Sequence, residues 1–207
     1  MCTRSSCFMK KLIHLITLTC IASLFSMALF ADDFLRSIPD FELTDHLGNN
    51  HSLEQYQDKD LLVFYVQGVG CPIVRIALPN LREVRDEFAS QNIEFLAFNA
   101  NIQDDLRRIA KEAEEFLIDF PILKDEDQQL AKALGVERTA EVFVVDPKTR
   151  KVHFRGPIND QLGYETQRNN ANKHYLKDAL NTVLAGGEVD MNDIPDSKGC
   201  LIAIFDT

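Results

Sequence analysis

The chain has 207 residues, of which 45% are hydrophobic and 26% are charged, with nine glycines and seven prolines. This mixture excludes the collagen-like, low-complexity and largely disordered classes. Lys and Arg number 22 against 32 Asp and Glu, a formal net charge of −10. The first 31 residues contain three basic residues and no acidic one, so the rest of the chain carries 19 basic against 32 acidic residues, or −13. A body this acidic is unsuited to nucleic acid or anionic lipid, so we expect small molecules or other proteins as partners.

Residues 1–31 have the layout of a secretory signal peptide. Two adjacent lysines precede an apolar stretch over residues 12–30, and acidic residues follow directly after Ala31. A basic start, an apolar middle and a small residue at the cleavage point are typical of such signals. We therefore expect cleavage after Ala31 or Ala28, export to the periplasm or the extracellular space, and no membrane association afterwards. A retained N-terminal membrane anchor is the alternative, because about 20 apolar residues can cross a bilayer.

Two of the five cysteines, Cys71 and Cys200, lie beyond the predicted signal. In an exported protein, two thiols allow one disulfide. The sequence leaves open whether these two cysteines meet, because they are 129 positions apart.

The first half of the remaining chain predicts alternating strands and helices. Residues 41–53 favour a short hairpin, and the apolar run at residues 61–66 is typical of a strand buried on both faces. A glycine-containing loop then leads into a helix from about residue 72 to residue 90, in which apolar side chains recur every three or four positions. Pro79 lies inside this helix and predicts a kink.

The second half continues the same alternation. The expected elements are a strand over 93–98, a helix over 104–117, a short helix over 128–134, strands over 142–145 and 152–154, and a helix over about 172–184. We therefore predict an α/β protein with a single domain over residues 32–187 and a C-terminal extension over residues 188–207 that carries Cys200.

Cys71 is the clearest candidate for chemistry. It lies between Gly70 and Pro72, after a buried strand and at the start of the predicted helix. The unpaired N–H groups and the dipole of a helix N-terminus favour a thiolate over a thiol. Arg75, one turn further on, would add a positive charge near the same sulfur. Both effects lower the pKa of the Cys71 thiol and favour a nucleophile near neutral pH. The alternative is a buried, inert cysteine.

These segments together resemble the thioredoxin-like redoxin group, which includes the alkyl hydroperoxide reductase and thiol-specific antioxidant family and the exported thiol-disulfide oxidoreductases. The resemblance covers residues 39–185 and rests on the segments 41–45, 61–65, 71–75, 120–125 and 142–146 and on Pro79. It implies a thioredoxin-like fold, with a central mixed sheet flanked by helices, and it puts Cys71 at the attacking position.

A narrower similarity is to peroxiredoxin-like proteins that end in a Gly-Cys-x-Ile segment, matched here by residues 199–202. This similarity implies that Cys200 is the second redox cysteine. The two-cysteine oxidoreductases carry their second cysteine three positions after the first, where this chain has Val74. A mixed disulfide at Cys71 must therefore be resolved by Cys200 or by an outside thiol.

Two further departures concern the surroundings of the sulfur. Peroxiredoxins have a Pro seven positions and a Thr three positions before the attacking cysteine, and this chain has Phe64 and Gly68 there. The group usually has a cis-proline after Thr139, and this chain has Ala140, at which a cis peptide bond would be costly. The sequence therefore does not reveal the hydrogen bonds that would activate a peroxide.

The predicted function is that of an exported thiol-based oxidoreductase, peroxiredoxin-like or active in thiol-disulfide exchange. Cys71 would attack a peroxide or a protein disulfide, and Cys200 would condense with the product to form a disulfide. An external dithiol reductant protein would then restore both thiols. The supporting residues are Gly70, Pro72, Arg75 and Thr139, and we expect neither a metal nor an organic cofactor.

Two other functions stay open at this point. One is a non-catalytic thioredoxin-like binding module in which Cys71 is inert or part of a structural bridge. The other is a copper-handling protein, which is less favoured because copper chaperones of this fold use two cysteines separated by three residues. Arg75 occupies the second of those positions in this chain.

Overall fold

The structure is a computed structural model that describes residues 37–162 and 167–205. The chain from Ser37 onward forms one compact unit. The predicted signal peptide at residues 1–31 lies outside the described residues. Within the described ranges, none of the helices combines the length and the apolar character needed to cross a membrane.

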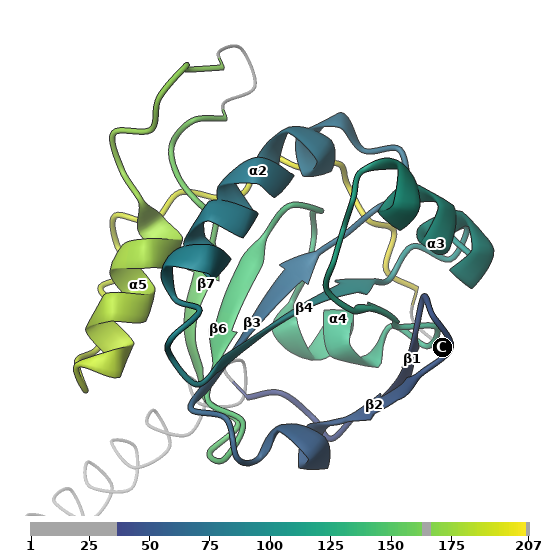
Figure 1. The fold of residues 1–207 in the computed structure, drawn as a ribbon, viewed down its shortest axis with the longest axis horizontal. Coiled ribbons are helices and arrows are strands. Elements are labelled where there is room, and N and C mark those ends of the chain that lie inside the picture. Colours follow the sequence, from purple (N-terminus) through teal and green to yellow (C-terminus); the bar gives the residue numbers. More distant parts are fainter. Residues whose placement is uncertain (1–36, 163–166, 206–207) are drawn as a thin grey trace, which may run out of the picture. The chain divides into compact units, whose positions relative to one another are not determined.

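A seven-stranded mixed sheet forms the centre of the described chain, in the order β2-β1-β5-β4-β3-β6-β7 (Figure 1). Strand β3 pairs in parallel with β4, which pairs in parallel with β5, whereas β3–β6, β6–β7, β1–β2 and β1–β5 are antiparallel. All six residues of β3 are buried, as its continuous apolar sequence predicts. The strands are β1 Glu42–Asp45, β2 Asn50–Ser52, β3 Leu61–Val66, β4 Ile93–Asn99, β5 Ile122–Lys124, β6 Val142–Val145 and β7 Val152–Gly156.

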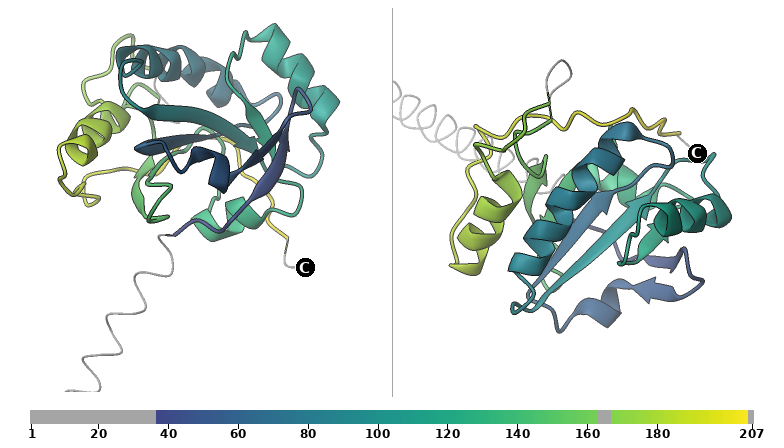
Figure 2. Two further views of the ribbon diagram at one scale, coloured as in Figure 1. Left: turned by 60° about the horizontal axis from the view of Figure 1, so that its bottom comes forward. Right: turned by 45° about the horizontal axis from the view of Figure 1, so that its top comes forward.

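Helices cover both faces of this sheet (Figure 2). Successive side chains of a strand point to opposite faces, and β3 therefore contributes to two hydrophobic clusters. Val63 and Tyr65 join the cluster under α2, α3 and α5, whereas Phe64 and Val66 join the cluster under α4 and the short 3-10 helix η2. The helices are η2 Leu53–Tyr56, α2 Pro72–Glu87, α3 Leu106–Glu115, α4 Gln129–Leu134 and α5 Tyr175–Leu184.

The order of elements agrees with the sequence prediction, with small differences at the ends. Helix α2 ends at Glu87 rather than near residue 90, and it includes Pro79. Strand β5 was not predicted, because it has only three residues and follows Pro121, which is too short a pattern for periodicity to detect. This strand joins the β1–β2 hairpin to the central parallel strands.

The segment that follows α5 returns to the sheet as an extended chain. Figure 2 (right) shows it passing the N-terminal end of α2 on its way to the C-terminus. Leu201 forms an isolated antiparallel bridge with Arg138, and the Ile202 N–H donates to the carbonyl oxygen of Glu137 at 2.9 Å. The Ile202 side chain is buried in the cluster on the α4 side of the sheet. The C-terminal extension is thus packed onto the domain.

Candidate active site

Cys71 lies at the N-cap of α2, directly before Pro72 at the first helical position. The Arg75 N–H donates to the Cys71 carbonyl oxygen and closes the first helical turn. Gly70 has a φ of +79°, a conformation that side-chain-bearing residues rarely adopt, so the loop needs glycine at this point. The predicted position of Cys71 is therefore confirmed: its sulfur lies at a helix N-terminus, where the backbone favours negative charge.

Cys71 and Cys200 form a disulfide, with 6.2 Å between their Cα atoms. The two cysteines differ in accessibility: Cys71 is only 4% exposed, whereas Cys200 is exposed. The question that the sequence leaves open, whether these distant cysteines meet, is answered by this bond. Through the disulfide, the C-terminal segment covers the end of the helix that carries Cys71.

Thr139 links the two cysteines a second time. Its Oγ1 accepts a hydrogen bond from the Cys200 N–H at 2.9 Å and lies 3.1 Å from the Cys71 Sγ. A disulfide sulfur carries no hydrogen, so the Thr139 hydroxyl must be the donor to Cys71. The same donor would stabilise a Cys71 thiolate in the reduced protein, because a hydrogen bond to the charged form lowers a pKa.

Gly68 makes room for that threonine. A Cβ atom at position 68 would lie 2.6 Å from the Thr139 Cγ2 and 2.9 Å from the Asn101 Nδ2, closer than such atoms approach. Position 68 is where the resembling peroxiredoxins carry a threonine. In this chain the hydroxyl beside Cys71 comes instead from Thr139, 68 positions later.

Arg75 has a partner that the sequence did not indicate. Its Nε and Nη2 donate to the two carboxylate oxygens of Glu112 on α3, at 2.9 and 2.8 Å. Hydrogen bonding to Glu112 raises the pKa of Arg75. Glu112 is 4% exposed and also accepts from the Gly70 N–H at 3.2 Å. The carboxylate therefore offsets the arginine's charge and ties the cysteine loop to α3.

A buried polar cluster forms hydrogen bonds with the loop that precedes Cys71. Asp104 is 1% exposed, and its Oδ2 accepts hydrogen bonds from the Val69 N–H and from the side-chain amides of Asn99 and Asn101, each at 3.0 Å. The Asn99 amide also donates to Gln67 at 2.6 Å. These residues lie at or just after the carboxyl ends of β3 and β4, which meet at one edge because the strands are parallel. That placement is the signal by which sequence analysis could have found them.

Ala140 stands where the resembling proteins have a cis-proline. No peptide bond in the described part of the chain is cis, and Ala140 adopts a φ of +59°. Its N–H donates to the Val66 carbonyl oxygen at 2.7 Å, and its side chain lies in the cluster that contains Cys71. The alanine thus keeps a backbone hydrogen bond that a proline could not make.

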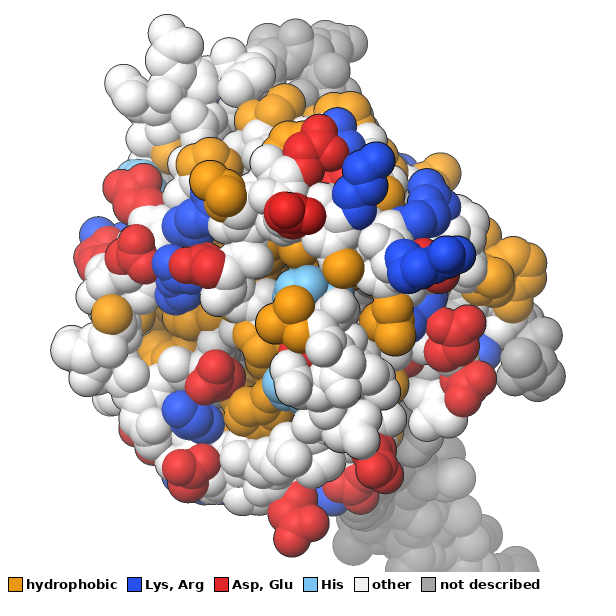
Figure 3. All heavy atoms as spheres, turned by 45° about the vertical axis from the view of Figure 1, so that its right-hand side comes forward, with side chains coloured by type: hydrophobic (Ala, Val, Ile, Leu, Met, Phe, Trp, Pro, Cys, Tyr) orange, Lys and Arg blue, Asp and Glu red, His pale blue; other side chains and the backbone are white. Residues whose placement is uncertain are grey.

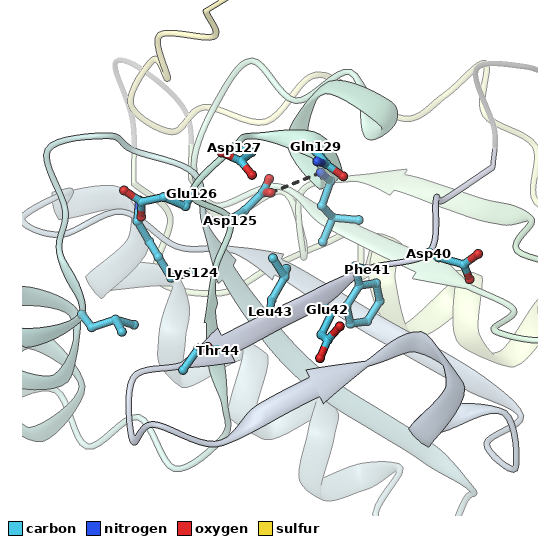
Figure 4. Close-up of a pocket in the computed structure, with 12 residues that line it drawn as sticks. Asp40, Phe41, Glu42, Leu43, Thr44, Lys124, Asp125, Glu126, Asp127 and Gln129 are labelled. Atoms are coloured by element: carbon cyan, nitrogen blue, oxygen red, sulfur yellow. Dashed lines mark hydrogen bonds and ion pairs between the residues drawn. The ribbon is translucent and has the colours of Figure 1, made fainter. Parts of the chain in front are cut away.

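A hollow of about 480 Å³ lies on another part of the domain, between β1 and the segment that joins β5 to α4 (Figure 4). Its lining is rich in carboxylates, but neither cysteine belongs to it. The carboxylate of Asp125 accepts hydrogen bonds from the backbone N–H groups of Leu130 and Ala131 in α4. Figure 3 shows acidic and basic side chains interspersed over one face of the molecule. The hollow is therefore not part of the site around the disulfide.

Of the predicted site residues, Cys71, Cys200 and Thr139 are in direct contact through the disulfide and two hydrogen bonds. Gly70 and Pro72 shape the loop and the first helical position. The acidic and amide side chains under the loop were not predicted from the sequence. Within the described ranges, no three His, Cys, Asp or Glu side chains are grouped so as to hold a metal ion.

Known proteins resemble both the sequence and the fold. Thiol-disulfide oxidoreductase ResA from Geobacillus thermodenitrificans (strain NG80-2) is 30% identical over 116 residues, 55% of this chain and 65% of that protein. Peroxiredoxin Bcp from Escherichia coli (strain K12) is 29% identical over 98 residues, 47% of this chain and 61% of Bcp. The matches thus span less than two thirds of these curated relatives. The crystal structure of a hypothetical protein from Sinorhizobium meliloti 1021 has a TM-score of 0.68 and 27% identity, covering 81% of this chain and 92% of that one.

The fold, the mixed sheet and the cysteine at a helix N-terminus define the class: a redoxin of thioredoxin-like fold, as the sequence predicted. The AhpC/TSA family profile matches residues 35–154, which is more than half of the chain. The chain therefore belongs to the AhpC/TSA family. Cys200 lies beyond the matched segment, so its pairing with Cys71 comes from the structure alone.

Proposed function

We propose that this protein is a thiol-dependent oxidoreductase in which Cys71 is the attacking thiolate and Cys200 the resolving cysteine. The observation that carries the proposal is the disulfide between Cys71, at the N-terminus of α2, and Cys200, with the Thr139 hydroxyl donating to the Cys71 sulfur. The membership of the AhpC/TSA family supports it. The names of the ResA and Bcp relatives agree with the same class of chemistry.

In the first step, the Cys71 thiolate attacks an electrophile. With a peroxide, an S–O bond forms, the O–O bond breaks, and the departing oxygen takes up a proton from solvent, which leaves a sulfenic acid on Cys71. With a disulfide substrate, the thiolate attacks one sulfur, the S–S bond breaks, and the other sulfur leaves as a thiolate. The backbone N–H groups at the start of α2 and the Thr139 hydroxyl stabilise the attacking sulfur in both cases.

In the second step, the Cys200 thiolate attacks the modified Cys71 sulfur. A sulfenic acid releases its oxygen as water, and a mixed disulfide releases the substrate's thiolate. Both routes end in the Cys71–Cys200 disulfide, so the absence of a cysteine at position 74 is compensated by a residue 129 positions away from Cys71.

In the last step, an external dithiol protein reduces the pair. Its thiolate attacks the sulfur of Cys200, because Cys200 is an exposed residue whereas Cys71 is almost fully buried, and Cys71 leaves as the thiolate that its surroundings stabilise. The second thiol of the partner then releases Cys200. The cycle uses no metal or organic cofactor.

We further propose that residues 1–31 direct export and are removed, that residues 32–187 form the redoxin domain, and that residues 188–207 act as its resolving tail. The basic and apolar N-terminal sequence supports the export proposal. A disulfide also suits an oxidising compartment such as the periplasm.

The test is the rate of alkylation of Cys71 as a function of pH, in a Cys200→Ser variant so that only one mature thiol reacts. We expect a midpoint at least one pH unit below the value of about 8.5 for an unperturbed cysteine. The same variant unfolded in urea is the control and should titrate normally. A folded-state midpoint at or above the unfolded value would favour an inert cysteine and a binding module instead.

A further inference from the structure

The C-terminal segment at residues 199–205 is attached to the domain by more than the disulfide. The backbone of Thr139 donates to the Cys200 carbonyl oxygen at 2.9 Å, and Ile202 donates to Glu137 at the same distance. Ile202 is 7% exposed and lies in a core cluster. None of these contacts requires a bond between the two sulfurs.

Gln128 contacts this segment through its side-chain amide. Its Nε2 donates to the carbonyl oxygens of Ala100 and Ala203, both at 2.8 Å, and its Oε1 accepts from the Phe205 N–H at 2.9 Å. The residue is 2% exposed and adopts a φ of +57° at the N-cap of α4. One buried amide therefore joins the loop after β4 to two residues of the C-terminal segment.

We propose that Gln128 is a positioning residue that keeps residues 199–205 docked when the disulfide is reduced, so that Cys200 stays beside Cys71. The consequence for catalysis rests on the proposed function, whereas the docking itself does not. Without Gln128, the buried carbonyl oxygen of Ala100 and the part-buried groups of Ala203 and Phe205 would lose this partner. A buried acceptor left without a partner is more costly than one that water can reach.

Docking matters because closing the disulfide is an intramolecular reaction. Its equilibrium constant against an external thiol equals an effective concentration, which is highest when the reacting groups are already held together. In the mixed disulfide of Cys71 with glutathione, the Cys200 thiolate attacks the Cys71 sulfur, the new S–S bond forms, and glutathione leaves as its thiolate. An undocked tail loses conformational freedom when the disulfide forms, and this entropy cost lowers the equilibrium constant for closure.

The experiment compares Gln128→Glu with Gln129→Glu in the full mature chain. The first change keeps the size of the side chain and removes both donated hydrogen bonds, while the second makes the same chemical change at an exposed neighbour. Gln128→Met, which adds no charge, is a second variant in case the carboxylate prevents folding. Amide hydrogen exchange at Ile202 and Phe205 is measured in a Cys200→Ser background, where no disulfide can form. Closure is measured in the Cys200-containing proteins by equilibration with reduced and oxidised glutathione.

We expect these amides to be protected in the Cys200→Ser protein, and their protection to fall about tenfold or more with Gln128→Glu but not with Gln129→Glu. The closure equilibrium should fall about tenfold, whereas the alkylation rate of Cys71 in the Cys200→Ser background should stay unchanged. A merely structural defect would alter that rate too. Unprotected tail amides in the Cys200→Ser protein, or unchanged protection and closure with both Gln128 variants, would overturn the proposal. If the unmodified chain never closes its disulfide, the proposed function fails, while hydrogen exchange still decides the docking.

Discussion

The two halves of the disulfide are positioned in different ways. Cys71 is placed by its immediate neighbours: a buried strand, a loop with Gly70 at positive φ, and Pro72 at the first position of α2. Cys200 contacts Thr139, and Ala203 in the same segment contacts Gln128; both partners lie more than 60 positions earlier in the chain than Cys200. The position of Cys71 thus follows from local sequence, whereas that of Cys200 depends on long-range packing. Substitutions around Cys71 should therefore affect its reactivity, whereas substitutions around Cys200 should affect closure of the disulfide.

The largest effect on turnover is expected from substitution of the two cysteines themselves, and the two substitutions should act differently. Cys71→Ser removes the nucleophile and should lower the turnover of peroxide or disulfide by at least about 10³-fold. Cys200→Ser should leave the first reaction of Cys71 intact and stop the cycle after one equivalent of oxidant. A stopped-flow burst followed by steady-state turnover measures both. Equal loss of the burst in the two variants would mean that Cys200 does more than resolve.

The second-largest effect is expected in the C-terminal segment at Gly199, which has no space for a side chain. A Cβ at this position would overlap the carbonyl oxygen of Thr139, so Gly199→Ala must displace the backbone that carries Cys200. We expect the equilibrium constant for disulfide closure to fall about 30-fold, equivalent to about 2 kcal/mol. Leu201→Ala is the matched control, because its side chain is 71% exposed. Similar closure in both variants would contradict the close contact with Thr139.

The surroundings of Cys71 are tested at Thr139, whose hydroxyl donates to the Cys71 sulfur. Thr139→Val keeps the shape and removes the hydroxyl, so the pKa of the Cys71 thiol should rise by about one unit and alkylation near pH 7 should slow about tenfold. Thr139→Ser should restore most of the rate. Thr149→Val, at an exposed turn, serves as the control and should leave the pKa and the alkylation rate of Cys71 unchanged. An unshifted pH profile of alkylation in Thr139→Val would contradict the claim that the Thr139 hydroxyl stabilises the Cys71 thiolate.

The smallest effect concerns the support of the loop rather than its chemistry. Glu112→Gln weakens the paired contact with Arg75 and leaves a guanidinium that is about one-third exposed without its counter-charge. We expect the free energy of unfolding to fall by about 1 kcal/mol, less than for a fully buried pair because water screens the arginine. Urea denaturation of the oxidised protein measures the change. Glu114→Gln, exposed on the same helix, should cost almost nothing.

The same division explains what could be predicted from the sequence. The β3–Cys71–α2 unit follows from a continuous apolar run, two glycines and a proline, which are local signals. The roles of Thr139 and Glu112 depend on which strands and helices are neighbours, and periodicity carries no such information. A cis peptide bond was expected to be costly at Ala140, and the structure has a trans bond and a positive φ there. The path of the C-terminal segment had no local signal, because its docking rests on a single buried isoleucine, backbone hydrogen bonds and one glutamine side chain.

The central claim is that Cys71 reacts first and Cys200 resolves it. Peptide mapping by mass spectrometry tests it most directly, on the reduced mature protein before and after one equivalent of hydrogen peroxide. The account predicts that peroxide converts two free thiols into a linked Cys71–Cys200 peptide pair and that a dithiol reverses the link. If the two cysteines never become linked and Cys71 remains unmodified, Cys71 is not the nucleophile, and the account is contradicted.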